Sequence, residues 1–257
     1  MDQDNLSRAL AVLADGEPVA GFHRANLSGR DALGLLPHCF LLRLWNLEES
    51  DYLLLSRAKR VAVRHGNSVL ASGTVTDAAR RMTPEGLVTQ VVFSPAIGLW
   101  EAPVSLSVEA GVSVSETVRR ILAASGTGIR LLTWSGPDPV RSRGQAFFGR
   151  AAECVSAALS AASALGYLTE GGLGIVPASG LPVTMTLTEK DLIDEPSFAA
   201  GNLMILRTTV TGWPLGKRAA VEWKGKRVEG IVLERSVDAD SVRGGWEGGL
   251  IVQMHNE

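Results

Sequence analysis

Lys59-Arg60-Val61-Ala62-Val63 and Lys217-Arg218-Ala219-Ala220-Val221 are two similar stretches that lie far apart in the chain. Each is followed by a short break at a glycine and then by a strand-like run that carries an internal glycine, Gly73 in the first copy and Gly230 in the second. Because the order and spacing of these features agree, we interpret them as two related β-modules. The alternative is that two unrelated antiparallel meanders share a general pattern.

The two copies also end alike, on β-rich runs at Val88–Phe93 and Leu250–Met254. An isolated glycine inside a strand usually marks a bulge, a bend or a close backbone approach. We therefore expect Gly73 and Gly230 to occupy equivalent positions of this kind.

Two polar segments of the first copy are predicted to be loops. Thr76 to Gly86 is polar and is predicted to be solvated, with a contact between subunits as the alternative role for Arg80 and Arg81. Glu48-Glu49-Ser50-Asp51 is predicted to be a solvated turn. A cation site is the alternative there, but nothing in the spacing fixes several oxygens as metal ligands.

The composition is that of a folded soluble protein, long enough for one large domain or two modest ones. The 257 residues carry a formal net charge of −2, so no bulk attraction to nucleic acid or anionic membrane is expected. Cys39 and Cys154 lie on apolar segments and are predicted to be free thiols buried in separate parts of the core. No apolar run approaches bilayer-spanning length, and the acidic N-terminus is unlike a signal peptide, so synthesis in the cytoplasm is expected.

Local signals place further elements on either side of the first copy. Asp15-Gly16 between two apolar runs predicts a hairpin, with a helix through Leu6, Leu10 and Leu13 as the alternative. The apolar run Cys39 to Leu47 predicts a strand.

The middle of the chain is predicted to mix helices with short strands. Ser113-Val114-Ser115-Glu116 resembles a capping box, and the helix that it opens is expected to end at Gly126. A second helix is predicted from about Gly149 to Leu165, ended by Gly166. A hairpin is expected around Glu170-Gly171-Gly172, which lacks the lysine of a phosphate-binding loop.

No constellation of residues in the sequence points to catalysis. The histidines share no metal-ligand spacing with cysteines or carboxylates; they are His23, His38, His65 and His255. There is no nucleophile elbow and no paired-cysteine zinc signature. We therefore predict no catalytic, cofactor-binding or metal-binding residue, no cofactor and no enzymatic activity, which is the profile of a structural or assembly protein.

The predicted fold class is α+β, mainly β, with two similar antiparallel β-barrels that flank a mixed α/β middle region. The expected boundaries are 5–108 for the first β-barrel module, 109–183 for the central region and 184–257 for the second β-barrel module.

This order of elements resembles the tail and baseplate hub proteins of bacteriophages, including the late control protein D group and the hub-like half of the VgrG spike proteins. The resemblance covers most of the chain. It is carried by the Asp15-Gly16 hairpin, by Gly111 to Val118 leading into the first central helix, by Gly149 to Val176, by Asp191 to Pro196, and by Gly216 to Val232. The chain is short for that family, its connecting segments look trimmed, and it has no appended lytic or spike domain.

The resemblance implies a structural role in a phage or phage-like injection particle. In such hubs a homotrimer joins the sixfold tail tube to the threefold spike, because each subunit contributes two similar barrels to a pseudo-sixfold ring. The expected partners are the tail tube protein, the central spike protein and the tape measure protein. The expected location is the virion, after synthesis in the host bacterial cytoplasm, and the genome is expected to pass through the ring without specific binding.

The alternative function is an OB-like barrel protein that binds a small molecule or nucleic acid. That function predicts basic grooves with interleaved aromatic side chains. Aromatic residues make up 5% of this chain and its net charge is negative, so the structural role is favoured.

Overall fold

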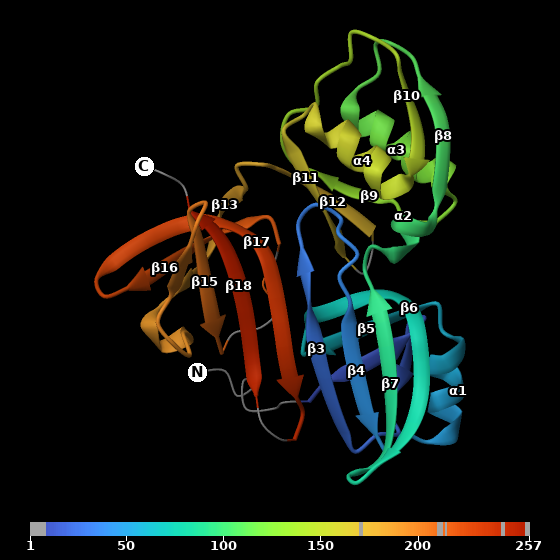
Figure 1. Ribbon diagram of the computed structural model, residues 1–257, viewed down its shortest axis with the longest axis vertical. Coiled ribbons are helices and arrows are strands. Elements are labelled where there is room, and N and C mark those ends of the chain that lie inside the picture. Colours follow the sequence, from blue (N-terminus) through green and yellow to red (C-terminus); the bar gives the residue numbers. More distant parts are fainter. Residues whose placement is uncertain (1–8, 170–171, 210–212, 214, 243–244, 255–257) are drawn as a thin grey trace.

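The computed structural model describes residues 9–169, 172–209, 213, 215–242 and 245–254. Figure 1 shows two β-rich modules side by side and, beyond their upper ends, a region of helices and small sheets. Each of the three parts has its own cluster of buried hydrophobic side chains.

The first β-module is an antiparallel arrangement with the strand order β3-β4-β7-β6-β5-β1-β2. Its hairpin at Asp15-Gly16 is confirmed, since both turn residues have positive φ, 49° and 93°, and β1 pairs with β2. The elements of the first β-module are β1 (Ala11–Ala14), β2 (Glu17–Val19), β3 (Arg24–Ala32), β4 (Phe40–Trp45), α1 (Glu49–Arg57), β5 (Arg60–His65), β6 (Ser68–Thr83) and β7 (Gly86–Ser94).

The second β-module repeats this order. Its strands run β14-β15-β18-β17-β16-β13, which corresponds strand by strand to β3-β4-β7-β6-β5-β1. The one difference in direction is at the end, because β13 pairs with β16 in parallel whereas β1 pairs with β5 antiparallel. The elements are β13 (Leu181–Leu187), η2 (Glu189–Asp191), β14 (Ser197–Ala199), β15 (Leu203–Thr208), β16 (Lys217–Trp223), β17 (Lys226–Asp240) and β18 (Trp246–Met254).

The two β-modules are joined by direct strand pairing. Glu234–Asp240 of β17 pairs antiparallel with Asn26–Ala32 of β3, so both modules belong to one 13-stranded sheet. The sequence predicted two closed barrels, and this detail is not confirmed. Within the described residues no sheet closes on itself, because the edge of β3 is hydrogen-bonded to the other module.

Two segments predicted as loops are regular structure. Thr76 to Gly86 continues β6 as far as Thr83, and only Pro84 and Glu85 form the turn to β7. The acidic segment begins helix α1, where Glu49 and Asp51 occupy the first turn and interact favourably with the positive end of the helix dipole. Glu48, Glu49 and Ser50 are exposed, as a solvated segment would be, but they start a helix rather than a turn. The helix forms because the residues that follow pack on the core, with Leu55 fully buried.

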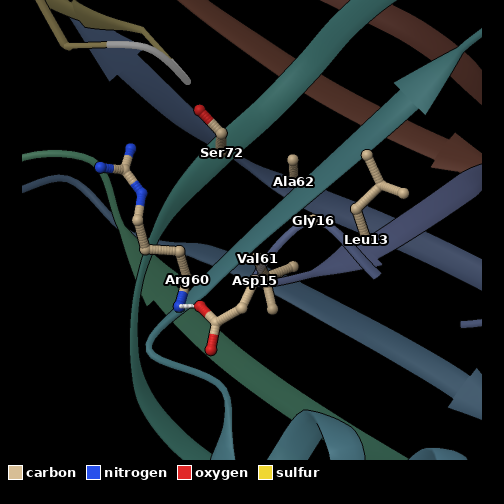
Figure 2. Close-up of a pocket in the computed structure, with 7 residues that line it drawn as sticks. All are labelled: Leu13, Asp15, Gly16, Arg60, Val61, Ala62 and Ser72. Atoms are coloured by element: carbon tan, nitrogen blue, oxygen red, sulfur yellow. Dashed lines mark hydrogen bonds between the residues drawn. The ribbon is translucent and has the colours of Figure 1, made fainter. Parts of the chain in front are cut away.

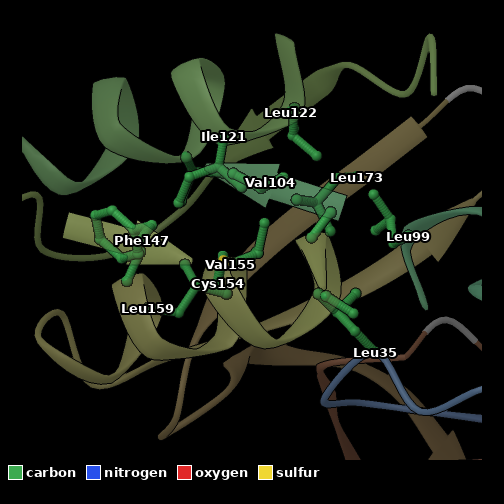
Figure 3. Close-up of a cluster of buried hydrophobic side chains, with 14 of the residues drawn as sticks. Leu35, Leu99, Val104, Ile121, Leu122, Phe147, Cys154, Val155, Leu159 and Leu173 are labelled. Atoms are coloured by element: carbon green, nitrogen blue, oxygen red, sulfur yellow. The ribbon is translucent and has the colours of Figure 1, made fainter. Parts of the chain in front are cut away.

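The central region packs three helices against two small sheets. The elements are α2 (Ile97–Glu101), β8 (Pro103–Val108), α3 (Val114–Ser125), β9 (Leu131–Trp134), β10 (Gln145–Arg150), α4 (Ala151–Ser160), β11 (Ala164–Thr169) and β12 (Gly172–Pro177). Figure 3 shows its core, where Ile121 of α3 and Val155 and Leu159 of α4 face one another. Leu35, from the loop after β3, enters the same core and connects the central region to the first β-module.

The first central helix agrees with the sequence, and the second is shorter than predicted. Ser113 Oγ accepts a hydrogen bond from the Glu116 N–H at 3.3 Å, and Gly126 ends α3 with a φ of 66°. The second helix ends at Ser160, and Gly166 lies in strand β11. A Cβ at Gly166 would lie 3.2 Å from a Leu35 side-chain carbon, so close packing between parts of the molecule explains this glycine.

The two cysteines are free thiols, as predicted, but only one of them is buried. Cys154 lies inside the central core on α4. Cys39 is exposed, which corrects the prediction, because it falls in the irregular segment that precedes β4 rather than in the strand itself.

Candidate functional site

The repeated sequence occupies the same register in both β-modules. Gly73 of β6 pairs with Val61, the residue after Lys59-Arg60, and Gly230 of β17 pairs with Ala219, the residue after Lys217-Arg218. The pairing register shifts between Val75 and Asp77 in one module and between Val232 and Glu234 in the other. These shifts lie at the same distance from the two glycines, so the modules share a bulge as well as a strand order.

Both internal glycines are positions of close backbone approach, as predicted. A Cβ at Gly73 would lie 2.4 Å from the carbonyl carbon of Ser94, at the end of β7. A Cβ at Gly230 would lie 2.4 Å from the carbonyl oxygen of Gln253, near the end of β18. Each glycine therefore lets the long bent strand cross close to the closing strand of its own module.

The junction between the β-modules is held by ion pairs at both ends. Arg24 donates to the buried carboxylate of Asp240, with Nη2 at 2.6 Å from Oδ2, and its guanidinium stacks 4.2 Å above the ring of Trp45. The hydrogen bond to Asp240 is the largest cause of a raised pKa for Arg24. At the other end, Arg235 Nη2 lies 3.5 Å from Asp31 Oδ2.

Asp31 is a buried carboxylate at this junction, with 4% of its surface exposed. Its burial raises its pKa above the ordinary value, and the nearby Arg235 opposes that change. Arg235 also donates to the carbonyl oxygen of Trp213 at 2.9 Å. Buried ion pairs contribute little net stability but penalise any other register strongly, since a slip would leave a charge unpaired.

One face of the sheet crosses both β-modules and carries charged side chains together with apolar ones such as Ile205 and Leu41; we call it the shared sheet face. The strands that form it are β15, β18, β17, β3, β4, β7 and the second half of β6, and Figure 1 shows them side by side. Alternate residues point to this face and away from the cores, and those with charge are Arg24, Arg30, Arg43, Arg81, Arg207, Asp77, Glu234, Asp238, Asp240 and Glu247. Five arginines accompany five carboxylates, so the formal charges on this face cancel.

Several of these charges are paired across strands. Arg30 Nη1 lies 3.4 Å from Glu234 Oε1 across the junction, and Arg207 Nη2 lies 2.7 Å from Glu247 Oε2. Paired charges of both signs make the face hydrophilic without a net attraction for a polyanion.

The two arginines singled out in the sequence have different roles. Arg80 donates to the carbonyl oxygen of Leu47 at 2.8 Å and lies over the ring of Tyr52 at 4.1 Å. It also forms an ion pair with Glu49 of α1. Arg81 is exposed on the shared sheet face.

A pocket of about 260 Å³ lies beside the first copy of the repeat, and Figure 2 shows the residues that line it. The carboxylate of Asp15 in this pocket accepts hydrogen bonds from the backbone N–H groups of Arg60 at 2.8 Å and Lys59 at 3.0 Å. Asp15 thereby fixes the hairpin turn to the start of β5. Among the residues that the structure describes, those that line this pocket include no aromatic side chain on which a nucleic-acid base could stack.

The described residues contain no group of three or more histidine, cysteine, aspartate or glutamate side chains placed to hold a metal ion. Across the same residues, no helix has both the length and the apolar character needed to cross a membrane.

Comparison with known proteins identifies the fold. No protein-family model matches the sequence, and no curated protein matches it. Solved structures do match: a tail protein from Neisseria meningitidis MC58 has a TM-score of 0.71 at 11% sequence identity, covering 95% of this chain and 96% of that one. The 43 kDa tail protein of prophage MuSo2 from Shewanella oneidensis has a TM-score of 0.71 at 10% identity, covering 95% of each chain.

A third match comes from a secretion machine. An Escherichia coli protein, described as a component of the type VI secretion system with structural similarity to the T4 bacteriophage tail proteins gp27 and gp5, has a TM-score of 0.71 at 11% identity. The match covers 96% of this chain and 77% of that one. At these identities the likeness establishes a shared fold, so this chain has the fold of phage tail proteins and of a type VI secretion component, as the resemblance implied.

Proposed function

We propose that this protein is the structural tail or baseplate hub of a phage or phage-like injection particle. It acts as a homotrimeric adaptor between the sixfold tail tube and the threefold spike, and it is not an enzyme. The observation that carries the proposal is the internal duplication, with the same strand order, the same glycine register and the same bulge in both β-modules.

The duplication suits a symmetry adaptor for a geometric reason. A trimer of a chain with two similar β-modules presents similar units at sixfold positions, while everything else in the chain remains threefold. The β-modules then face the tube protein, and the central region, which has no internal copy among the described elements, suits the threefold spike. The proposed division of the chain is 5–108, 109–183 and 184–257, although α2 and β8, at the end of the first part, pack on the central core, and β13 begins before residue 184.

The shared sheet face has the character needed for the wall of a passage. Its charges cancel, and several of them are paired. A wall of this kind lets a nucleic acid or another cargo pass without holding it, because binding to a phosphate backbone requires a surplus of positive charge. The tape measure protein is a further partner in this arrangement, and the virion is the location of the protein.

The number and position of copies in intact particles test this function. Electron microscopy of the particles, with this chain located by its fold, is expected to find three copies on the tail axis between tube and spike. Six copies in the tube wall, or none in the particle, would contradict the proposal.

A further inference from the structure

The two long bent strands, β6 and β17, are equivalent but differ in what covers their edges. The second half of β17, Glu234–Asp240, pairs with β18 on one side and with β3 on the other. The equivalent half of β6, Asp77–Thr83, pairs with β7 on one side. On its other side, none of the described strands pairs with it.

The strand that would complete this arrangement is also at an edge. β14 occupies in the second β-module the place that β3 occupies in the first, and it ends the strand order of the sheet. In Figure 1, β6 and β15, the neighbour of β14, lie on opposite sides of the molecule. One chain therefore has two matching edges that cannot reach each other.

We propose that the second half of β6 takes β14 of a second copy of this chain, and that this contact repeats the β17–β3 junction between subunits. The inference deepens the proposed trimeric hub by naming the surfaces that would join its subunits. The contact is head to tail, because β6 and β14 are different surfaces, and a head-to-tail contact forms a ring when its rotation closes.

The register of the proposed contact is taken from the β17–β3 junction. Val237 of β17 pairs with Gly29 of β3. The strand pairings that relate the two β-modules make Arg80 the equivalent of Val237 and Phe198 the equivalent of Gly29. Arg80 therefore lies opposite Phe198 of the next copy, Ala79 opposite Ala199 and Arg81 opposite Ser197.

Exposed hydrophobic side chains lie at both edges and on matching faces. Met82 of β6 is 77% exposed and Phe198 of β14 is 56% exposed. In the proposed register they are diagonal neighbours across the contact, within reach of long and aromatic side chains. Ala239, the equivalent of Met82 at the internal junction, is fully buried. Exposed strand edges with apolar side chains are unfavourable in an isolated subunit, and a partner strand removes that cost.

The proposed contact differs from the internal junction in its chemistry. The internal junction has the charged residues Asp240 and Arg235, whereas the equivalent positions on β6 are Thr83 and Ala78. The contact between subunits therefore lacks the buried ion pairs of the internal junction and relies mainly on backbone hydrogen bonds and apolar burial. Such a contact depends weakly on ionic strength.

Cysteine pairs test the contact and its register. In a Cys39→Ser background, Ala79→Cys and Ala199→Cys are introduced separately into the full chain, and the two variants are mixed at micromolar to millimolar concentrations under mild oxidation. We expect a disulfide between the two variants but not within either variant alone, and we expect the double variant to give a covalent trimer. Ala78→Cys is the matched control, because residue 78 points to the opposite face and should not cross-link with Ala199→Cys.

The contribution of the apolar side chains Met82 and Phe198 to the contact is measured separately. Sedimentation of the full chain is expected to show that Met82→Ala or Phe198→Ala weakens self-association by about tenfold or more. Phe148→Ala removes a side chain that is 88% exposed in the central region and should have no such effect.

The results of these experiments distinguish a failure of the proposed β6–β14 contact from a failure of the proposed hub function. A trimer in which residues 79 and 199 do not cross-link overturns the edge contact and leaves the trimeric hub in place. A chain that neither associates nor cross-links across the concentration range also overturns the contact, and the hub is then judged by its copy number in particles.

Discussion

Replacing either internal glycine with alanine should destabilise the protein by a similar and predictable amount. The Cβ of Gly73→Ala would lie 2.4 Å from the Ser94 carbonyl carbon, and that of Gly230→Ala would lie 2.4 Å from the Gln253 carbonyl oxygen. Ordinary contacts between such atoms begin at about 3.4 Å, so a paired strand must move by about 1 Å in either variant. Backbone atoms cannot rotate away as a flexible side chain can.

Overpacking of this kind costs about 1–3 kcal/mol. We expect about 2 kcal/mol for each variant, which corresponds to a fall in Tm of about 4–8 °C for a chain of this length. The assay is differential scanning calorimetry at one fixed protein concentration, because any self-association makes Tm depend on concentration.

Gly98→Ala is the matched control for the two glycine variants. Gly98 lies in helix α2, and the atom nearest to an added Cβ is Thr74 Oγ1 at 4.0 Å. This variant should leave Tm unchanged or raise it slightly, since alanine lowers the conformational entropy of the unfolded chain. If Gly73→Ala or Gly230→Ala melts at or above the temperature of Gly98→Ala, the close approach inferred for that glycine is wrong.

Three further predictions concern the junction, the thiols and the first central helix. Burial raises the pKa of Asp31 in the folded protein, so the stability that its protonated form contributes is fully present below the unfolded pKa near 3.8. That stability is lost as the pH rises through the folded pKa. Urea titrations at several pH values should show that the Asp31→Asn variant loses less stability over this pH range than the wild-type chain. Ellman's reagent should modify the exposed Cys39 rapidly and the buried Cys154, whose pKa burial also raises, only on unfolding, and equal native rates would contradict this. Ser113→Ala removes the cap of α3 and should cost about 1 kcal/mol in urea unfolding, and no loss would mean that the cap contributes nothing.

The sequence was informative wherever local chemistry decides the structure. Asp15-Gly16 specified a turn because both residues tolerate positive φ, and Ser113 and Gly126 marked the ends of α3 because helix termini need a side-chain acceptor and a left-handed residue. The repeated Lys-Arg dipeptides and the internal glycines Gly73 and Gly230 were recognisable because an internal duplication keeps its spacing.

The sequence was misleading where a strand is polar or forms an edge. No strand was predicted over residues 24–32, since asparagine, serine, glycine and aspartate in that segment are typical of turns, although Ala25 and Leu27 show the alternation of a half-buried strand. The second half of β6 was read as a loop because one of its edges and one of its faces meet solvent.

By itself, then, the sequence determined the class of the fold, the internal duplication and the absence of a recognisable catalytic motif, because each can be read from short local patterns, which in the duplication occur twice. Only the tertiary structure decided that β17 pairs with β3, that the two modules share one open sheet and that Asp31 and Asp240 are buried beside arginines far away in the sequence. Pairing between strands separated by some 200 residues, as in Arg24 with Asp240, is set by shape and buried charge across the whole molecule, and no local pattern records it.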